Sequence, residues 1–212
     1  MKPNPRKCNV MNFSFAKCPP VFPALHIAES PLPEVDSLRI LGIILQRDLK
    51  WNSHVSSMVS KASRRLYILC RLRKCNLRQS ELANVYVMYI RPVLEYAAPI
   101  WSSAITTQQS ADLERVQKRA CRIILSGYTS YTSALETLGI PSLEARRQTL
   151  LSNFGLRLLS SRHRDLLPEF RGQTTTRQLR NSNELNIPMC RTTRYRKSVI
   201  PTIVRLINSD LK

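Results

Sequence analysis

The chain has 212 residues, of which 43% are hydrophobic, so it has enough apolar side chains for a core and its composition argues against wholesale disorder. Its 33 Lys and Arg residues outnumber its 14 Asp and Glu residues, which gives a formal net charge of +19. A compact body with this excess repels itself unless an anionic partner neutralises it, and nucleic acid is the favoured partner, with a membrane surface as the rival.

Neither a membrane span nor a signal peptide is expected from the sequence. No window reaches the roughly 18 uninterrupted apolar residues that a spanning helix needs. The apolar part of the N-terminus is broken by Asn12 and Ser14 and ends at Lys17, which is a poor match to a signal peptide. We therefore expect an intracellular protein, with the nucleus as one alternative and the exact compartment left open.

The first 51 residues are expected to form strands and turns. Apolar and polar residues alternate from Met11 to Phe15, which is the period of a half-buried strand. Prolines at positions 19, 20, 23, 31 and 33 indicate an irregular connection, with a possible short strand near residues 24–30. The β-branched run over residues 37–45 predicts a strand, and Gly42 within it predicts a bend or the close approach of another backbone.

From residue 52 onward the apolar spacing is that of helices. We expect a helix over residues 53–74 capped by Ser53, and a second over residues 78–90. The second helix should end at Arg91, because the residue before a proline is disfavoured in helical angles, and Pro92 should begin a helix that runs to about Trp101.

Further helices are predicted at residues 107–125, at a short segment that ends at Gly139, and at residues 143–160 with Ser142 as the cap. The stretch after Pro168 is polar and basic, as in a linker or an extended arm, and the last residues regain a helical pattern. The expected fold is mainly α, with short N-terminal strands, a helical bundle and a basic, partly irregular C-terminal region. The predicted domains are residues 1–51, 52–105, 106–167, 168–198 and 199–212.

The sequence shows no pattern typical of an active site. Nucleotidyl-transfer chemistry needs clustered carboxylates that hold two magnesium ions about 3.5–4 Å apart, but the acids here are dispersed and form no Asp-x-Asp pair. The six cysteines contain no Cys-x-x-Cys spacing and the three histidines lie far apart, so no zinc site is predicted. We assign no catalytic residue, no metal ligand and no cofactor to this chain.

Two helices carry the charge that indicates a partner. A charged helix face is ordinarily a solvated face, but residues 55–80 contain no acid, so ion pairs cannot explain this one. Contacts with nucleic-acid phosphates would explain it. The candidate nucleic-acid-binding residues are Lys61, Arg64, Arg65, Arg71, Arg73, Lys74, Lys118, Arg119 and Arg122. For the aromatic residues Tyr86, Tyr89, Tyr96 and Trp101, packing in the core is favoured over base stacking.

Three blocks of sequence resemble the region downstream of the palm in reverse transcriptases of non-LTR retrotransposons, the jockey-like group especially. They read YVMYIRPVLEYAAPIWSS, then LERVQKRACRIILSGY, then LGIPSLEARRQTL. Any one block is a weak indication, whereas three in this order are specific. The matching residues are Tyr86, Arg91, Pro92, Leu94, Glu95, Tyr96, Ala97, Pro99, Trp101, Leu113, Glu114, Gln117, Ala120, Leu138, Gly139, Pro141, Ser142, Leu143, Arg146 and Arg147.

Upstream, NPRKC resembles the palm turn that follows the catalytic loop of this family, and SLRILGIIL resembles its primer-grip hairpin. The resemblance implies that Leu41, Gly42 and Ile43 support the primer end and that residues 52–105 form a thumb. It also implies that Lys7 lies on the triphosphate side, although a solvated turn lysine is the favoured alternative. The metal-binding carboxylates, which hold Mg²⁺ in the intact parent polymerase, would then lie in an upstream palm and fingers.

Three hypotheses follow. The first is a truncated RNA-directed DNA polymerase that binds RNA or an RNA–DNA hybrid through backbone phosphates and does not polymerise alone. The second is a non-enzymatic basic helical module that contacts nucleic acid or a protein. The third is association with a membrane surface, which ranks last because the apolar stripe of residues 53–74 has Ala and Val where membrane helices prefer Trp or Phe.

Overall fold

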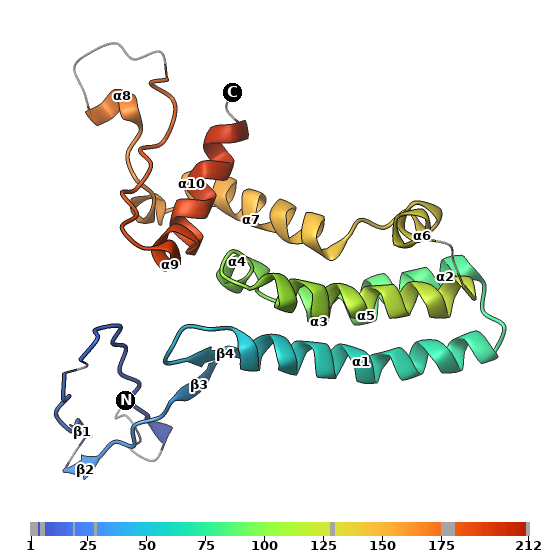
Figure 1. The fold of residues 1–212 in the computed structure, drawn as a ribbon, viewed down its shortest axis with the longest axis horizontal. Coiled ribbons are helices and arrows are strands. Elements are labelled where there is room, and N and C mark those ends of the chain that lie inside the picture. Colours follow the sequence, from blue (N-terminus) through green and yellow to red (C-terminus); the bar gives the residue numbers. More distant parts are fainter. Residues whose placement is uncertain are drawn as a thin grey trace. The chain divides into compact units, whose positions relative to one another are not determined.

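A computed structural model describes residues 4, 7–18, 20–27, 29–127, 130–174 and 181–210. It divides into two compact units, Met1–Ser57 and Met58–Lys212, and each is described by itself. The fold is mainly α, with two small antiparallel strand pairs near the N-terminus (Figure 1), as the sequence predicts. The five predicted domains stay predictions.

The first unit contains two short hairpins. Strand β1 (His26–Ile27) pairs with β2 (Ser30–Pro31), and β3 (Ser37–Ile40) pairs with β4 (Ile43–Gln46). Between β3 and β4, Leu41 and Gly42 have φ angles of 48° and 88°, so this two-residue turn has positive φ at both positions, as a type I′ hairpin requires. The bend that Gly42 predicts is confirmed.

The strand predicted from Met11 to Phe15 is wrong. These residues belong to no strand, and the neighbouring Val10 forms only an isolated bridge with Glu34. Phe13 and Phe15 are 43% and 53% exposed. An alternating pattern becomes a strand only where a partner strand and a buried face are available, and no strand described in this unit pairs with these residues.

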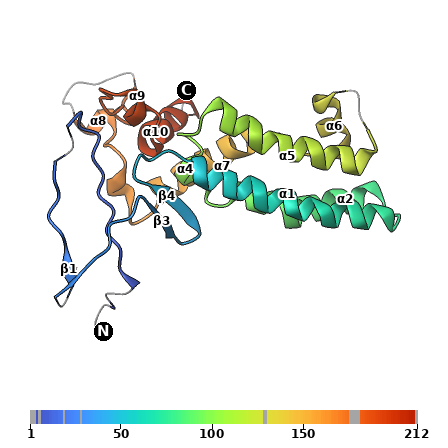
Figure 2. The ribbon, with the colours of Figure 1, turned by 60° about the horizontal axis from the view of Figure 1, so that its bottom comes forward.

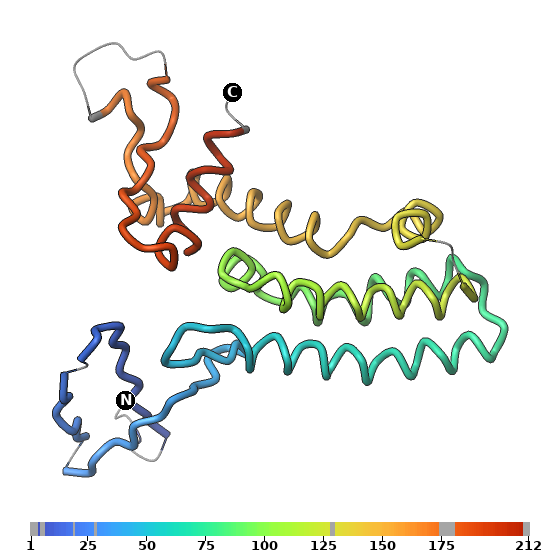
Figure 3. The backbone as a smooth tube through the Cα atoms, in the orientation of Figure 1, coloured from blue at the N-terminus to red at the C-terminus, as the bar shows by residue number. Residues whose placement is uncertain are grey.

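Helix α1 (Asn52–Lys74) is continuous along its whole length (Figure 3) and begins one residue before the predicted cap, Ser53. The N–H of Ser53 donates to Gln46 Oε1 (3.0 Å), and the N–H of Ile44 donates to His54 Nδ1 (3.4 Å). These bonds join the second hairpin to the first turn of α1. The predicted apolar stripe is confirmed, since its buried members are Val55, Met58, Ala62, Leu66 and Leu69.

The prediction that a helix ends at Arg91 is wrong. Helix α2 (Gln79–Val85) continues through a π-helical turn, η2 (Tyr86–Ile90), into α3 (Arg91–Glu95), and Arg91 has helical angles. Its N–H bonds to the carbonyl of Tyr86, five residues back. A regular α-helix would force the ring of Pro92 against a carbonyl of the preceding turn, and the wider π turn relieves that conflict.

The single helix predicted from Pro92 to Trp101 is interrupted. Tyr96 leaves the helical region, Ala97 takes a left-handed conformation with φ of 50°, and α4 (Ala98–Trp101) then begins. Pro99 has no N–H to continue the first helix, and it fits the first turn of a new one. The Trp101 Nε1–H donates to the freed carbonyl of Tyr96 (2.9 Å).

The next three helices confirm their predictions. Helix α5 (Thr107–Leu125) starts with a capping box in which Thr106 Oγ1 accepts from the N–H of Gln109. Helix α6 (Tyr131–Leu138) ends at Gly139, whose φ is 60°, and α7 (Leu143–Leu159) starts at the Ser142 cap. The apolar spacing of residues 143–160 predicts a buried stripe of Leu143, Leu150, Leu151, Phe154 and Leu158, but Phe154 is 40% exposed and does not belong to it.

The C-terminal region forms a second core against α7. The short elements η3 (Arg164–Leu166), α8 (Arg171–Thr174) and α9 (Thr193–Arg196) precede α10 (Val199–Asp210), which crosses α7 at the end away from α6 (Figures 1 and 2). Leu185 is fully buried, and Asn208 satisfies its backbone by bonding both its N–H (2.8 Å) and its carbonyl (2.9 Å). The core contains Leu151, Leu158, Leu167, Leu185, Ile203, Val204 and Ile207.

Candidate nucleic-acid interface

Four of the predicted binding residues form one solvent-facing surface on α1. Lys61, Arg64, Arg71 and Lys74 are exposed, and none of their side chains forms an ion pair or hydrogen bond with the residues that the structure describes. They lie opposite the buried stripe of Ala62, Leu66 and Leu69. We call these four residues the α1 cationic face.

The two other cations of α1 hold helices together. The guanidinium of Arg65 lies 4.3 Å from the ring centroid of Tyr89 and donates to the Tyr89 carbonyl. Arg73 Nη1 donates to the carbonyl of Ile123 (2.8 Å), and its Nη2 donates to Ser126 Oγ (2.5 Å), so Arg73 caps the last turn of α5. These contacts are a structural role that the sequence does not reveal.

The remaining candidates lie on α5. Arg119 and Arg122 are exposed, whereas the Lys118 ammonium lies 5.0 Å from the ring centroid of Tyr131. Because Arg73 bonds to Ile123 and Ser126, the C-terminal ends of α1 and α5 lie together (Figure 2). The structure thus brings the basic last turns of these two helices side by side.

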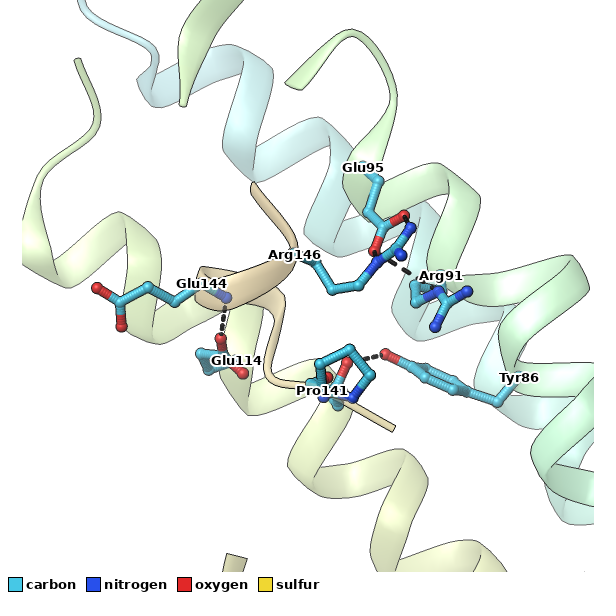
Figure 4. A network of polar contacts seen from close by, with 8 residues as sticks. Tyr86, Arg91, Glu95, Glu114, Pro141, Glu144 and Arg146 are labelled. Carbon is cyan, nitrogen blue, oxygen red and sulfur yellow. Dashed lines mark hydrogen bonds and ion pairs between the residues drawn. The ribbon is translucent and has the colours of Figure 1, made fainter. Parts of the chain in front are cut away.

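The residues that carry the resemblance form a polar network in the helical unit (Figure 4). Glu95 receives two bonds from Arg146, Nε to Oε1 and Nη2 to Oε2, both 2.8 Å, and Arg91 Nε lies 3.5 Å from the same carboxylate. The side chain of Glu95 is only 11% exposed. The hydrogen bond with Glu95 raises the pKa of Arg146.

A second part of the network joins η2, α5 and the start of α7. The Tyr86 hydroxyl donates to Gln117 Oε1 (2.5 Å), and Gln117 Nε2 donates to the carbonyl of Pro141 (2.9 Å). Burial raises the pKa of Tyr86 well above its usual range, so its hydroxyl keeps the proton that it donates. Since Gln117 is fully buried, these two bonds satisfy an amide that is shielded from solvent.

Glu114 ties α5 to α6 and to the start of α7. Its Oε2 accepts from the hydroxyl of Tyr131 (2.6 Å), and its Oε1 accepts from the backbone N–H of Glu144 in the first turn of α7 (2.7 Å). Burial, followed by the bond to Glu114, raises the pKa of Tyr131 above its usual range. A carboxylate at the N-terminal end of a helix is also favoured by the helix dipole.

The three motif blocks therefore meet in one place and fix helices to each other. The charged side chains of Arg91, Glu95, Glu114 and Arg146 are bonded within the chain, which identifies this network as a structural element rather than as a binding surface. We call it the motif network, and its members are Tyr86, Arg91, Glu95, Glu114, Gln117, Pro141, Glu144 and Arg146.

A hollow of about 670 Å³ lies beside the motif network, between α5, α7 and α10. Its wall includes Arg147, which is 4% exposed and whose Nη2 donates to Ser110 Oγ (2.6 Å). Burial lowers the pKa of Arg147. Lys118 and Arg147 are balanced there by Glu114 and Glu144, so this hollow does not share the positive charge of the α1 cationic face.

Other predicted positions lie apart from these surfaces. Within the first unit, Lys7 is exposed, and at the hairpin turn Leu41 is 85% exposed, Gly42 is exposed and Ile43 is half-buried. Across the described residues, no three His, Cys, Asp or Glu side chains are grouped so that they could hold a metal ion. Within the same residues, no helix has the length and apolarity to cross a membrane.

Two features escape the sequence prediction. Tyr86 and Trp101 are buried as predicted, but Tyr89 and Tyr96 are 42% and 52% exposed, and Tyr67 on α1 is 65% exposed. The stretch after Pro168 is basic as the sequence predicts, but the prediction did not single out the cations around α9 as binding candidates, which the absence of any acid between Glu184 and Asp210 could have indicated. The exposed cations there are Arg191, Arg194, Arg196 and Lys197.

Residues 51–86 match a family described as alkylated DNA repair protein alkB homolog 8, N-terminal. A curated relative, described as a probable RNA-directed DNA polymerase from transposon X-element of Drosophila melanogaster, is 25% identical over 125 residues. That match covers 57% of this chain but only 13% of the relative. No solved structure matches the chain. The similarity supports a region like that of retrotransposon reverse transcriptases.

Proposed function

We propose that this chain is a nucleic-acid-binding part of an RNA-directed DNA polymerase of the jockey-like non-LTR retrotransposon type. It corresponds to the end of the palm, the thumb and the region that follows. The observation that carries the proposal is the α1 cationic face, whose four positive side chains have no partner among the described residues. The similarity to a transposon polymerase supports the family.

In this proposal α1 lies along the backbone of RNA or an RNA–DNA hybrid. A helix of 23 residues is about 34 Å long, which is enough to follow several phosphates. Binding of each phosphate releases condensed counterions, so affinity falls steeply as salt rises. The ligand is read through its shape and backbone, because Lys and Arg contacts to phosphates carry no sequence information directly.

The first unit has a separate proposed role. The tip of the second hairpin, at Leu41 and Gly42, would support the primer end in the assembled polymerase, and Lys7 would lie on the triphosphate side. The carboxylates that bind Mg²⁺ would come from the upstream palm. Primer extension by this chain with Mg²⁺ should therefore stay at background, and measurable synthesis would overturn the non-catalytic part of the proposal.

The test of binding is a salt titration of the full chain with a short RNA–DNA hybrid. Replacing Arg64 and Arg71 together with alanine should weaken binding regardless of sequence and lower the slope of log K against log salt by about 2, roughly 1 for each phosphate that is no longer neutralised. Arg115→Ala is the matched control, since Arg115 is also exposed but pairs with Asp112 (2.8 Å). Binding that is absent or independent of salt would contradict the proposal.

A further inference from the structure

Tyr67 is an exposed aromatic residue within the α1 cationic face. Its side chain is 65% exposed, more than Tyr89, Tyr96 or Tyr195. Arg64 lies three residues before it and Arg71 four residues after it, which are the spacings that bring side chains together on a helix surface. The Tyr67 ring therefore lies between two arginines.

Single apolar or aromatic residues on a surface are ordinary and need no explanation by themselves. What distinguishes Tyr67 is its surroundings. Both neighbouring arginines lack a partner among the described residues, and no acid occurs anywhere along α1. By contrast, the ring of Tyr89 is already in contact with the guanidinium of Arg65, 4.3 Å from its centroid.

We propose that the α1 cationic face takes a single-stranded segment of nucleic acid, with one unpaired base stacked on the ring of Tyr67 and the flanking phosphates bound by Arg64 and Arg71. This inference rests on the proposed function and specifies its ligand. Within a duplex the faces of the bases are covered by neighbouring base pairs, so away from the duplex ends only an unpaired base offers a free face to the ring. A cationic track with an aromatic side chain is the arrangement by which proteins hold single strands without regard to sequence.

An anionic membrane is the competing ligand for a basic face with an exposed ring. Membrane-surface helices bury a broad stripe of bulky apolar residues. On α1 the large apolar side chains with substantial exposure are Tyr67 and Ile68, at 65% and 39%, and the broad apolar stripe of this helix is already buried inside the protein. The single strand is therefore the better fit.

The experiment compares two ligands and three variants of the full chain. The ligands are a labelled 12-nucleotide oligouridine and a blunt 12-base-pair RNA–DNA hybrid. Tyr67→Ala should weaken binding of the oligouridine by about tenfold, within the range known for removal of one base–aromatic stack, and change binding of the hybrid by less than twofold. Tyr67→Phe should restore wild-type affinity, because stacking needs the ring and not the hydroxyl.

The controls separate stacking from charge. Tyr96→Ala removes another exposed ring, 52% exposed and next to Glu95, and should leave both affinities unchanged. The salt slope of Tyr67→Ala should equal that of the wild type, because the variant still neutralises the same phosphates.

Equal weakening on both ligands, or no weakening on the oligouridine, would overturn the single-strand assignment. The proposed function would still stand in that case if Arg64→Ala with Arg71→Ala lowered the salt slope. Absence of salt-dependent binding to either ligand would remove both proposals. Binding to vesicles of 30% phosphatidylserine that Tyr67→Ala abolishes, without any effect on oligouridine, would assign the ring to a membrane instead.

Discussion

The motif network and the α1 cationic face use the same side chain in opposite ways. In the network, Arg146 is held by two bonds of 2.8 Å to a carboxylate that is 11% exposed. On α1, Arg64 and Arg71 are exposed and have no acid on the whole helix to pair with. Positive charge therefore stabilises the fold in one region and remains available to a partner in the other.

This difference shows that residues that match the family motifs and residues that carry exposed positive charge indicate different things. The residues that match across the three blocks, such as Glu95, Glu114 and Gln117, lie where helices meet, so they report a common fold. The four residues of the α1 cationic face lie outside those blocks, on a helix that the resemblance describes less closely. A motif match alone would thus direct mutagenesis to the wrong surface.

The largest effect is expected at Glu95. Glu95→Ala would leave Arg146 and Arg91 without their carboxylate, and removal of one partner of a buried pair costs about 3–5 kcal/mol. Since the Arg146 side chain is 29% exposed and water can reach it, we expect the lower end of that range, about 3 kcal/mol, in urea unfolding. Asp112→Ala is the control, because its pair with Arg115 is exposed and should contribute less than about 1 kcal/mol. Equal effects of the two variants would contradict the claim that the Glu95–Arg146 pair stabilises the fold more than the exposed Asp112–Arg115 pair does.

A smaller destabilisation is expected from Tyr86→Phe. The variant keeps the buried ring but leaves Gln117 Oε1 without its donor, and an unsatisfied buried acceptor costs about 1–3 kcal/mol. Tyr67→Phe removes a hydroxyl from an exposed ring and should change the free energy of unfolding by less than about 0.5 kcal/mol. Thermal or urea unfolding of both variants measures this difference. A Tyr86→Phe variant with an unchanged free energy of unfolding would show that the Tyr86–Gln117 hydrogen bond contributes nothing to stability.

The helices with local signals were predictable from sequence, and the interruptions were not. The capping box of Thr106 and Gln109, together with an apolar residue at every third or fourth position, defines α5 from end to end. The π turn before Pro92 has no such signal, because the chain continues as a helix only where burial of Tyr86, Ile90 and Leu94 offsets the strained geometry. Proline alone predicts a stop.

The same limit applies to the candidate site. Exposure of Arg64 and Arg71 follows from their place opposite the apolar stripe, so sequence was sufficient there. The contacts of Arg65 and Arg73 are made to backbone carbonyls of residues 24 and 50 positions away, and a carbonyl carries no residue type that a sequence pattern could reveal. The arrangement of the three blocks into one network likewise depends on the packing of helices distant in sequence.

A further decrease in stability is expected at alkaline pH. Burial raises the pKa of the Cys121 thiol to about 11, and it raises the pKa of Tyr86 and Tyr131 as well. The folded chain therefore keeps protons that the unfolded chain releases above about pH 9 for the thiol and about pH 10 for the phenols. Stability that is fully present below about pH 9 should decline as pH rises, since unfolding then releases protons.

Urea unfolding at about pH 8, 9, 10 and 10.5 measures this decline. Cys121→Ala should move its onset from about pH 9 toward about pH 10, where the two tyrosines begin to contribute. A free energy of unfolding that stays constant up to about pH 10.5 would show that these groups are not shielded from water in solution.

The smallest effect on stability, and the sharpest contrast, is expected from two arginines on one helix. Arg73→Ala removes two bonds to the last turn of α5, at 2.8 and 2.5 Å, and should cost about 1 kcal/mol. Arg71→Ala should change stability by less than about 0.5 kcal/mol, yet lower the salt slope of nucleic-acid binding by about 1. Because the two residues lie two positions apart and carry the same charge, a general electrostatic effect would make the variants alike. A reversal, with Arg73 controlling the salt slope and Arg71 the stability, would require that the C-terminal end of α5, and not the outer face of α1, meets the ligand.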